Sequence, residues 1–506
     1  MPNPKGPFLL GLDIGSSSVK ASLLDASTGT SVASASSPDK ELEITAPKQG
    51  WAEQHPDTWW EHVRKATAKV VAEAGPAAAE GVKAVGISYQ MHGLVVVDKA
   101  LKPLRNAIIW CDSRAVGIGE RACESLGRKQ CLERLLNSPG NFTASKLRWV
   151  KENEPELYAK VHRMMLPGDY VALVMTGELC TTPSGLSEGI LWDYKDAGPA
   201  AMVLDHYGIS EELLPECKPT FSVQGTLLPE AASALKLKAG IPVAYRAGDQ
   251  PNNAFSLNVL EPGEVAATAG TSGVVYGVID KPLYDEQSRV NTFVHVNHAK
   301  KRPRYGMLLC VNGTGILNSW LRHNFGAAGM SYEAMNALAG SVPPGSAGLV
   351  VLPFGNGAER TLGNRNLGAA VCNLQLTVHT QAHLLRAAQE GIVFALAYGL
   401  GIMREAGVEV STVRAGHANM FLSPVFCEAF ASVTGATVEL YNTDGAQGAA
   451  RGAGIGAGVF GGPAEAFAGL KAVKTVGPSG LAKDSYDDAY RNWLETLAAR
   501  LDEESA

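Results

Sequence analysis

Residues 13–25 read DIGSSSVKASLLD and residues 268–280 read TAGTSGVVYGVID. Each stretch is a short turn rich in glycine and hydroxyl side chains between two apolar runs, which is typical of a β-hairpin. The two stretches are in phase at four pairs of identical residues: Gly15 with Gly270, Ser17 with Ser272, Val19 with Val274, and Asp25 with Asp280. An internal repeat of this kind indicates two related structural units in one chain.

The elements expected around the two hairpins recur in the same order. In the first half we expect strands at 8–15, 19–25 and 31–36, a helix at 55–75, and further strands at 82–89 and 94–98. In the second half we expect strands at 264–270, 273–280, 291–297 and 305–313, and then a helix at 315–325. Closely spaced strands followed by a helix predict an antiparallel meander in each half, so a duplicated α/β fold is the economical interpretation.

The two glycine turns have two interpretations. The backbone N–H groups and hydroxyls of such a turn form an anion-binding concavity, and one turn from each half could hold a polyphosphate in a cleft between two domains. Asp13 would repel phosphate unless a divalent cation lay between them, which indicates Mg²⁺ with a nucleotide. Alternatively, both turns are ordinary hairpins in which glycine supplies a positive φ angle. The turns alone do not decide between these interpretations.

Length and composition exclude several classes of protein. A chain of 506 residues is too long for one core, so two or more domains are expected. The net charge of −6 gives no basic footprint for nucleic acid or for a membrane surface. The first residues resemble neither a signal peptide nor a membrane span, and the eight cysteines are scattered without a CxxC pair. These features favour reduced thiols in a cytoplasmic protein.

Two histidine pairs have spacings that a metal ion could use, namely His295 with His298 and His379 with His383. No carboxylate accompanies either pair in an HExxH pattern, so we expect ordinary surface or strand histidines.

Further motifs give the chain a family resemblance along nearly its whole length. DIGSSSVK is similar to the first phosphate motif of the FGGY carbohydrate kinases, which belong to the actin/Hsp70/sugar-kinase group. Other segments fall in that family's order: GWAEQHPDTWW (50–60), SYQMHG (88–93), WCDSRA (110–115), FTASKLRWVKEN (142–153), AGDQPNNA (247–254), TAGTSG (268–273) and AERT (358–361). The resemblance implies an α/β fold with two ribonuclease-H-like domains flanking a catalytic cleft. We expect the sugar site, the first phosphate motif and the catalytic aspartate in residues 1–252, and the second phosphate motif with the adenosine subsite in residues 253–506.

The resemblance assigns Asp249, in AGDQPNNA, as the catalytic base. A sugar hydroxyl is too weak an acid to ionise at neutral pH, so the base accepts the proton late, as the bond to phosphorus forms. Without the resemblance, Asp249 in a G-D-x-P context could equally cap the helix that follows it.

The same resemblance places Asp13 as the Mg²⁺ partner, through water, because Mg²⁺ dehydrates reluctantly. The terminal phosphates of ATP would then be approached by residues of both turns: Ser16, Ser17 and Lys20 from the first, and Gly270, Thr271 and Ser272 from the second. The alternative for Lys20 is a solvent-facing strand residue.

Within the family, QMHGLVVVD followed by WCDSRA resembles the xylulokinase branch. Met91 and His92 occupy the sugar-contact positions, and Gly93 favours xylulose over gluconate, because gluconokinases have a serine after the Met-His pair. Gln250 follows the base where asparagine is usual, and its amide can still bridge two hydroxyls. Asp112 and Arg114 either line the same pocket or lock it by an ion pair. Trp51 could be a wall facing the sugar or part of a core between the domains, and we expect the core.

The sequence departs from the family where adenine and ribose bind. Most members have a glycine triplet there, whereas this chain reads VRAGHANMFLSPVF (413–426). Depending on the register, Gly416 survives from the triplet or Ala418, Asn419 and Met420 replace it. Less glycine means a less close approach of the nucleotide to the backbone. Gly416 and Asn419 are therefore the candidate adenosine contacts.

Together these features predict a cytoplasmic kinase that transfers the γ-phosphoryl group of MgATP to the 5-hydroxyl of D-xylulose. The expected partners are the sugar and ATP, without nucleic acid or membrane, and a homodimer is one alternative for the oligomeric state. Two rival hypotheses remain. One is a kinase for another polyol or sugar acid, such as gluconate, ribulose or glycerol. The other is a non-catalytic sugar or nucleotide sensor, or an actin-like filament protein, on the same fold.

Overall fold

The computed structural model describes residues 6–326 and 329–505, and the chain forms two compact units. Unit 1 contains residues 1–258, 293–305 and 443–470, and unit 2 contains 259–292, 306–442 and 471–506. We had expected a single boundary between residues 252 and 253. The chain instead first leaves unit 1 after Asn258 and later returns to it twice.

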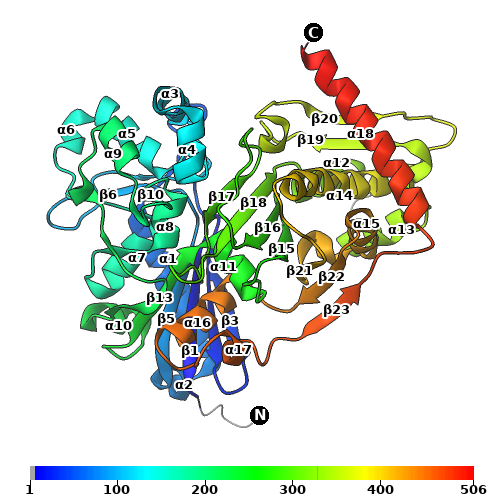
Figure 1. The fold of residues 1–506 in the computed structure, drawn as a ribbon. Helices are drawn as coiled ribbons and strands as arrows, with labels where there is room; N and C mark the ends of the chain where they lie inside the picture. Colours follow the sequence, from blue (N-terminus) through cyan, green and yellow to red (C-terminus); the bar gives the residue numbers. More distant parts are fainter. Residues whose placement is uncertain (1–5, 327–328, 506) are drawn as a thin grey trace. The chain divides into compact units, whose positions relative to one another are not determined.

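Unit 1 is built on a six-stranded sheet in the order β13-β14-β5-β1-β2-β3 (Figure 1). Its strands are β1 (Phe8–Ile14), β2 (Val19–Asp25), β3 (Thr30–Ser37), β5 (Val82–Tyr89), β13 (Phe221–Thr226) and β14 (Pro242–Gly248). The first three strands pair antiparallel as a meander, whereas β5 lies parallel to β1 and β14 lies parallel to β5. The carboxyl ends of β1, β5 and β14 therefore meet at one edge of the sheet, which is where open α/β sheets bind ligands.

Unit 1 also contains helices, several of which pack against this sheet. They are α1 (Pro56–Ala74), α2 (Pro76–Glu80), α3 (Val116–Leu126), α4 (Arg128–Leu135), α5 (Thr143–Asn153), α6 (Pro155–Tyr158), α7 (Pro167–Thr176), α8 (Pro183–Glu188), α9 (Ala201–Tyr207), α10 (Pro229–Leu235), α11 (Asp249–Ser256), α16 (Gly445–Gly456) and α17 (Pro463–Ala466). Short ladders join β4 (Glu53–Gln54) to β7 (Ala107–Ile108), β6 (Val95–Val97) to β8 (Arg163–Met165), β9 (Cys180–Thr181) to β12 (Glu216–Cys217), and β10 (Trp192–Asp193) to β11 (Gly198–Pro199).

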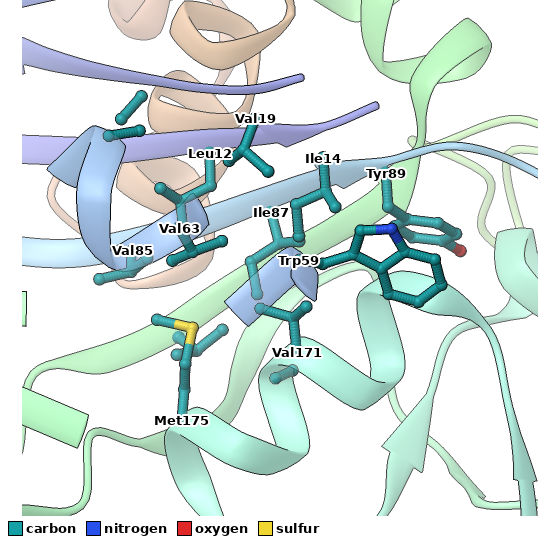
Figure 2. Close-up of a cluster of buried hydrophobic side chains, with 14 of the residues drawn as sticks. Leu12, Ile14, Val19, Trp59, Val63, Val85, Ile87, Tyr89, Val171 and Met175 are labelled. Atoms are coloured by element: carbon teal, nitrogen blue, oxygen red, sulfur yellow. The ribbon is translucent and has the colours of Figure 1, made fainter. Parts of the chain in front are cut away.

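One face of the sheet packs against α1 and α7 to form an apolar core (Figure 2). Figure 2 labels side chains from β1 (Leu12, Ile14), β2 (Val19), β5 (Val85, Ile87, Tyr89), α1 (Trp59, Val63) and α7 (Val171, Met175), all of them buried. The core also reaches the first glycine turn. Trp59 Nε1 donates to Gln54 Oε1 at 3.0 Å, and Gln54 Nε2 donates to the carbonyl oxygen of Ser16 at 2.7 Å.

The other face of this sheet is covered by α16, which comes from far along the chain and has the sequence GAQGAARGAGIG (Figure 1). A β-carbon added at Gly11 of β1 would lie 1.8 Å from the carbonyl oxygen of Ala446, and one added at Gly86 of β5 would lie 2.0 Å from that of Ala449. Only glycine permits this approach of strand to helix backbone. The small residues of α16 and the glycines of the strands therefore fix the helix on the sheet.

Unit 2 repeats the same arrangement of strands. Its seven-stranded sheet has the order β17-β18-β16-β15-β21-β22-β23, with strands β15 (Glu264–Ala269), β16 (Gly273–Ile279), β17 (Asn291–Val294), β18 (Tyr305–Val311), β21 (Thr412–Gly416), β22 (Thr437–Tyr441) and β23 (Ala472–Val476). β15 and β16 are antiparallel, β21 is parallel to β15, and β22 is parallel to β21. Taken from β23 to β18, the strands of this sheet occur in the same order as the unit 1 strands from β13 to β3, so that β15 and β16 correspond to β1 and β2. Strand β17 is an addition at the edge. The shared order supports the predicted duplication.

The remaining elements of unit 2 are helices and one hairpin. The helices are α12 (Gly315–Phe325), α13 (Tyr332–Gly340), α14 (Gln381–Glu405), α15 (Pro424–Thr434) and α18 (Lys483–Ser505), and the hairpin pairs β19 (Val350–Phe354) with β20 (Gly368–Cys372). Across the described residues, no helix combines the length and the apolar character that a membrane span requires.

The strands and helices expected from the sequence are present with small differences at their ends. The strand at 82–89 and the helix at 315–325 have the predicted bounds. The strand at 94–98 is shortened to Val95–Val97, and the strand at 291–297 is shortened to Asn291–Val294. α1 begins at Pro56 after the N-cap His55 and ends before Gly75, as predicted.

Candidate active-site residues

The first glycine turn, residues 15–18, joins β1 to β2 and is fixed by its neighbours. Gly15 N donates to the carbonyl oxygen of Ser18 at 3.0 Å, which closes the turn. The hydroxyl of Ser16 accepts from Trp110 Nε1 at 3.2 Å, and Ser17 is exposed. Gly15 does not have a positive φ angle, and neither does Gly270 in the second turn. The interpretation that these glycines supply a left-handed backbone is therefore wrong for both turns.

Asp13 lies near the end of β1, where three neighbouring groups act on its carboxyl. It is the cross-strand partner of Lys20 on β2, and its Oδ1 accepts from Ser88 Oγ on β5 at 2.9 Å. Burial raises the pKa of Asp13, whereas Lys20 and Ser88 lower it and the negative charge of Asp444 raises it further. Lys20 is exposed, so it can serve a phosphate or simply face solvent.

Asp249 is the first residue of α11 and follows β14 directly. The N-cap position of α11 is held by Gly248, which has no side chain to cap with. Asp249 therefore lies in the first helical turn and is not the N-cap that the G-D-x-P pattern allowed. Burial raises the pKa of Asp249 to about 7, and the negative charge of Asp13 is the next largest cause of the increase. The Gln250 side chain opposes the shift by donating to the Asp249 carboxylate.

Met91 and His92 follow β5, and β5 lies between β1 and β14 in the sheet. Asp13, the 91–92 segment and Asp249 are therefore brought to the same sheet edge by three adjacent parallel strands. Met91 is buried against the end of β14, since a β-carbon at Gly248 would lie 2.6 Å from Met91 Cγ. The ring of His92 packs edge-on against Phe142, with 4.8 Å between ring centroids.

Gly93 has a packing reason for being glycine. A β-carbon at this position would lie 2.6 Å from Cγ of Pro167, at the start of α7. The residue that favoured xylulose in the sequence is therefore also required by a contact with the protein itself, and its identity carries less information about the sugar than the motif suggested.

Glu188, at the end of α8, is a residue of this region that the sequence did not single out. Its side chain is 1 % exposed, and burial raises its pKa well above the usual range, with the charge of Asp249 adding to the increase. His92 N donates to Glu188 Oε2 at 3.3 Å, and His92 Nδ1 lies 2.9 Å from the carbonyl oxygen of Glu188. The only sequence signal was a charged residue among small and apolar ones in SGLSEGIL (184–191).

The WCDSRA segment forms an ion pair. Asp112 is fully buried, and its Oδ2 lies 2.7 Å from Nη2 of Arg114 and accepts from Ala52 N at 2.6 Å. Arg114 also contacts Glu53 at 2.7 Å and stacks over Trp51 with 3.8 Å to the ring centroid. The ion-pair interpretation of Asp112 and Arg114 therefore holds, and Trp51 packs against Arg114 and Trp149 within unit 1.

In unit 2, the second glycine turn, residues 270–272, is held by the beginning of α12. Gly315 N donates to the carbonyl oxygen of Gly270 at 2.8 Å, and Ile316 N donates to that of Thr271 at 3.2 Å. A β-carbon at Gly315 would lie 2.3 Å from the same Gly270 oxygen, so glycine is required there. Thr271 is exposed and Ser272 is half-buried. This turn thus leaves a hydroxyl available to a ligand.

Gly416 and Asn419 lie at the end of β21 and in the segment that joins β21 to α15. Gly416 ends β21, and Asn419 has a left-handed backbone with φ 54°. A β-carbon at Gly270 would lie 3.6 Å from Asn419 Nδ2, so the amide is close to the turn. Either register of the adenosine motif therefore places its residue at the carboxyl end of β21.

Glu359, from the AERT segment, supports the second turn indirectly. Its buried carboxylate accepts from Asn312 N at 2.9 Å and from Gly313 N at 3.2 Å, just before α12. Burial raises the pKa of Glu359 to about 7. AERT contributes to the family resemblance, but its pattern alone predicts no role for Glu359.

Among residues 6–326 and 329–505, no group of three or more histidine, cysteine, aspartate or glutamate side chains is arranged to hold a metal ion. His379 and His383 have ring centroids 5.6 Å apart, and His383 takes part in the capping box of α14. That these histidine pairs bind no metal stays a prediction.

Comparisons with known proteins agree with this description. The models of the N-terminal and C-terminal domains of the FGGY family of carbohydrate kinases match residues 8–256 and 265–459. The chain is similar to the xylulose kinase of Bacillus subtilis, with 30 % identity over 80 % of this chain and 79 % of that protein. It is also similar to the L-xylulose/3-keto-L-gulonate kinase of Escherichia coli, with 30 % identity over 97 % of both chains. The crystal structure of a kinase from Brucella ovis, described as a xyloylose kinase, superposes with a TM-score of 0.87 at 26 % identity, over 97 % of this chain and 99 % of that one.

These matches confirm the predicted two-domain α/β fold of the actin/Hsp70/sugar-kinase group. The chain belongs to the FGGY family of carbohydrate kinases and is an ATP-dependent carbohydrate kinase.

Proposed function

We propose that this kinase phosphorylates D-xylulose at its 5-hydroxyl, forming D-xylulose 5-phosphate and ADP. The observation that carries the proposal is the position of Asp249. Its carboxyl, with a pKa of about 7, lies at the sheet edge to which β5 brings Met91 and His92. The similarity to the xylulose kinase of Bacillus subtilis supports this substrate class.

Asp249 acts in this proposal as the general base. As the sugar oxygen bonds to the γ-phosphorus and the bond from phosphorus to the ADP oxygen breaks, the hydroxyl proton passes to the Asp249 carboxylate and then to solvent. A base with a pKa near the working pH is deprotonated often enough and still accepts a proton readily. Assistance of this kind is worth roughly 10²–10⁴-fold in rate.

The residues around Asp13 fit a Mg²⁺ ion. Asp13 offers a hard carboxylate oxygen, and the negative charges of Asp444 on Asp13, and of Asp13 on Asp249, each raise the neighbour's pKa, so a divalent cation would relieve the repulsion. When bound with ATP, Mg²⁺ neutralises charge on the phosphates. Asp13, oriented by Ser88, would hold the hydrated ion.

We assign the two glycine turns to the phosphates of ATP. Ser16, Ser17 and Lys20 of the first turn, and Gly270, Thr271 and Ser272 of the second, supply hydroxyls, backbone N–H groups and one ammonium group. Gly416 and Asn419 are the candidate contacts to adenosine. The proximity of Asn419 to Gly270 supports placing both on the same nucleotide.

A neutral ketose fits the charges better than a sugar acid. After burial, the strongest influence that raises the pKa of Asp249 is another carboxylate, Asp13, and Glu188 lies in the same region. Lys146, the cation acting on Glu188, is fully buried, and its ammonium group already donates to two carbonyl oxygens. A substrate carboxylate placed beside Asp249 would face the negative charge of Asp13. The alternative of a polyol or sugar-acid kinase is kept because the relative from Escherichia coli is described as acting on 3-keto-L-gulonate.

A substrate panel separates these alternatives. ADP release would be measured with D-xylulose, L-xylulose, D-ribulose, glycerol, gluconate and 3-keto-L-gulonate at equal MgATP. We expect the highest kcat/KM for D-xylulose, with NMR of the product showing phosphate on O5. A higher value for gluconate or 3-keto-L-gulonate would contradict the proposed substrate. No turnover with any sugar would favour the sensor alternative.

We further propose a cytoplasmic location, supported by the free thiols of all eight cysteines, which lie in the described part of the chain. A homodimer stays a prediction, to be tested by light scattering of the purified protein.

A further inference from the structure

We propose that Glu188 and Lys146 are positioning residues for the sugar, because together they hold the main chain and the imidazole of His92 in one conformation. The inference rests on the proposed sugar-binding role of His92. All three residues lie in unit 1. Neither Glu188 nor Lys146 needs to touch the substrate for this role.

His92 has a backbone conformation that it would not adopt unaided. Its φ angle is 62°, in the left-handed region, which is unfavourable for a residue with a β-carbon. Such a conformation persists only where the surroundings impose it, and it is concentrated at functional sites. Gly93, the next residue, is packed against Pro167 and cannot accept a side chain. The segment is therefore held against its local preference.

Glu188 and Lys146 bind both polar groups of the His92 backbone. The N–H group donates to Glu188 Oε2 at 3.3 Å, and the carbonyl oxygen accepts from Lys146 Nζ at 2.8 Å. Lys146 Nζ also donates to the carbonyl oxygen of Ile109 at 2.9 Å. Because Ile109 directly follows β7, this bond links His92 to the end of β7. Both side chains are fully buried, so water does not compete for these bonds.

The main chain of Glu188 also fixes the imidazole. Its carbonyl oxygen can only accept, so His92 Nδ1, 2.9 Å away, is the donor. In the neutral ring Nε2 then carries the lone pair and is an acceptor for a sugar hydroxyl. Phe142 packs at 4.8 Å and Phe293 at 5.5 Å between ring centroids, which restricts rotation of the ring.

A double-mutant cycle between Glu188 and His92 tests the inference. The variants are Glu188→Leu, Glu188→Gln, His92→Ala and Glu188→Leu with His92→Ala. Sugar KM, ATP KM, kcat and the melting temperature are measured for each, using whichever sugar the wild type phosphorylates best. Glu390→Gln is the matched control, because Glu390 is also a buried glutamate that accepts a backbone N–H, from Gly345, but it belongs to unit 2.

We expect Glu188→Leu to raise the sugar KM about tenfold, the value of roughly one hydrogen bond, while the ATP KM stays within twofold. In the His92→Ala background, Glu188→Leu should raise the sugar KM very little further, because the imidazole that Glu188 positions is absent. Glu188→Gln should recover most of the loss, since its amide oxygen can still accept from His92 N. Glu390→Gln should change the melting temperature without changing the sugar KM.

Two results would overturn the inference. One is an increase in sugar KM by Glu188→Leu that is as large in the His92→Ala background as in the wild type. The other is a folded Glu188→Leu enzyme in which the melting temperature or kcat falls while the sugar KM is unchanged. If Glu188→Leu does not fold, Lys146→Met is put through the same cycle, with the same expectation for the sugar KM. If the wild type phosphorylated none of the sugars, the proposed function would fail. That result comes from the wild type alone, so it is distinguishable from a failure of the Glu188 inference, which comes from comparing the variants.

Discussion

Gly445 lies directly against the carboxylate of Asp13: a β-carbon at position 445 would be 2.6 Å from Asp13 Oδ2. The two residues are far apart in the sequence, but α16 returns to unit 1 and begins at this point, with Asp444 as its N-cap. Asn252 Nδ2 also donates to the carbonyl oxygen of Gly445 at 2.9 Å, which links α16 to the helix of the proposed base. The proposed metal partner and the proposed base are therefore supported by one late segment of the chain.

Gly445→Ala should displace the Asp13 carboxylate, because the added methyl group has no space. We expect a decrease in kcat on the order of ten- to a hundredfold and a higher Mg²⁺ concentration at half-maximal rate. Steady-state kinetics over a Mg²⁺ titration measure both. Gly117→Ala in α3 is the control, since its β-carbon would meet only the flexible end of Arg121, at 3.4 Å. An unaltered Mg²⁺ dependence in Gly445→Ala would contradict the assignment of Asp13.

Gly315→Ala should weaken the binding of ATP without weakening the binding of the sugar. Its β-carbon would press on the carbonyl oxygen of Gly270 and move the second glycine turn. We expect the ATP KM to rise about tenfold or more, with the sugar KM nearly unchanged. Gly401→Ala in α14, where no atom lies within 4 Å of an added β-carbon, is the control in the same unit. Equal increases in both KM values would show that the turn does not serve ATP specifically.

The rate should depend on pH through Asp249. The base works only when deprotonated, and its pKa is about 7, so kcat/KM for the sugar should fall nearly tenfold for each pH unit below that value. The profile is measured from pH 5.5 to 8.5 with MgATP saturating. Enzyme held at each pH and then assayed at pH 8 reveals any irreversible inactivation. A flat profile between pH 5.5 and 8 would be inconsistent with this base.

The same pKa makes a prediction about stability. Asp249 has a folded-state pKa of about 7 against an ordinary value of 3.8, so its favourable contribution is full below about 3.8 and is lost as the pH rises through 7. The Asp249→Asn variant has no carboxyl at this position, so it does not lose stability in this way as the pH rises. The variant should be more stable than the wild type at pH 8, by about 2–4 kcal/mol, and the difference should shrink towards pH 4. Urea unfolding at the two pH values measures it. Asp205→Asn, at an exposed position in α9, should show no such change with pH.

Much of the fold and of the site was predictable because the signals are local. The two glycine turns were found from the phase of glycine, hydroxyl and apolar residues, and the bounds of α1 differ from the expected 55–75 by one residue at each end. The sheet-edge cluster of Asp13, His92 and Asp249 follows from parallel strands, but it was inferred through a family resemblance and not from strand order. The positions of these residues agree with that inference.

The parts that were missed depend on contacts between distant segments. α16 was not predicted, because its glycines disfavour a helix and only small alanines recur at helical spacing in GAQGAARGAGIG. These small residues are explained by the strands beneath the helix. Glu188 was missed for the same reason, since its partner His92 is remote in sequence. Lys146 did have a local signal: Phe142, Trp149 and Val150 lie at helical spacing from it, which places the lysine on the apolar face of α5.

The most direct test of the account is the turnover of Asp249→Ala with D-xylulose and MgATP. We predict that kcat falls by roughly 10²–10⁴-fold. Binding of D-xylulose and of ATP, measured by calorimetry, should stay within a few-fold of the wild type. Unchanged turnover in a correctly folded Asp249→Ala enzyme would contradict the central claim that Asp249 is the base.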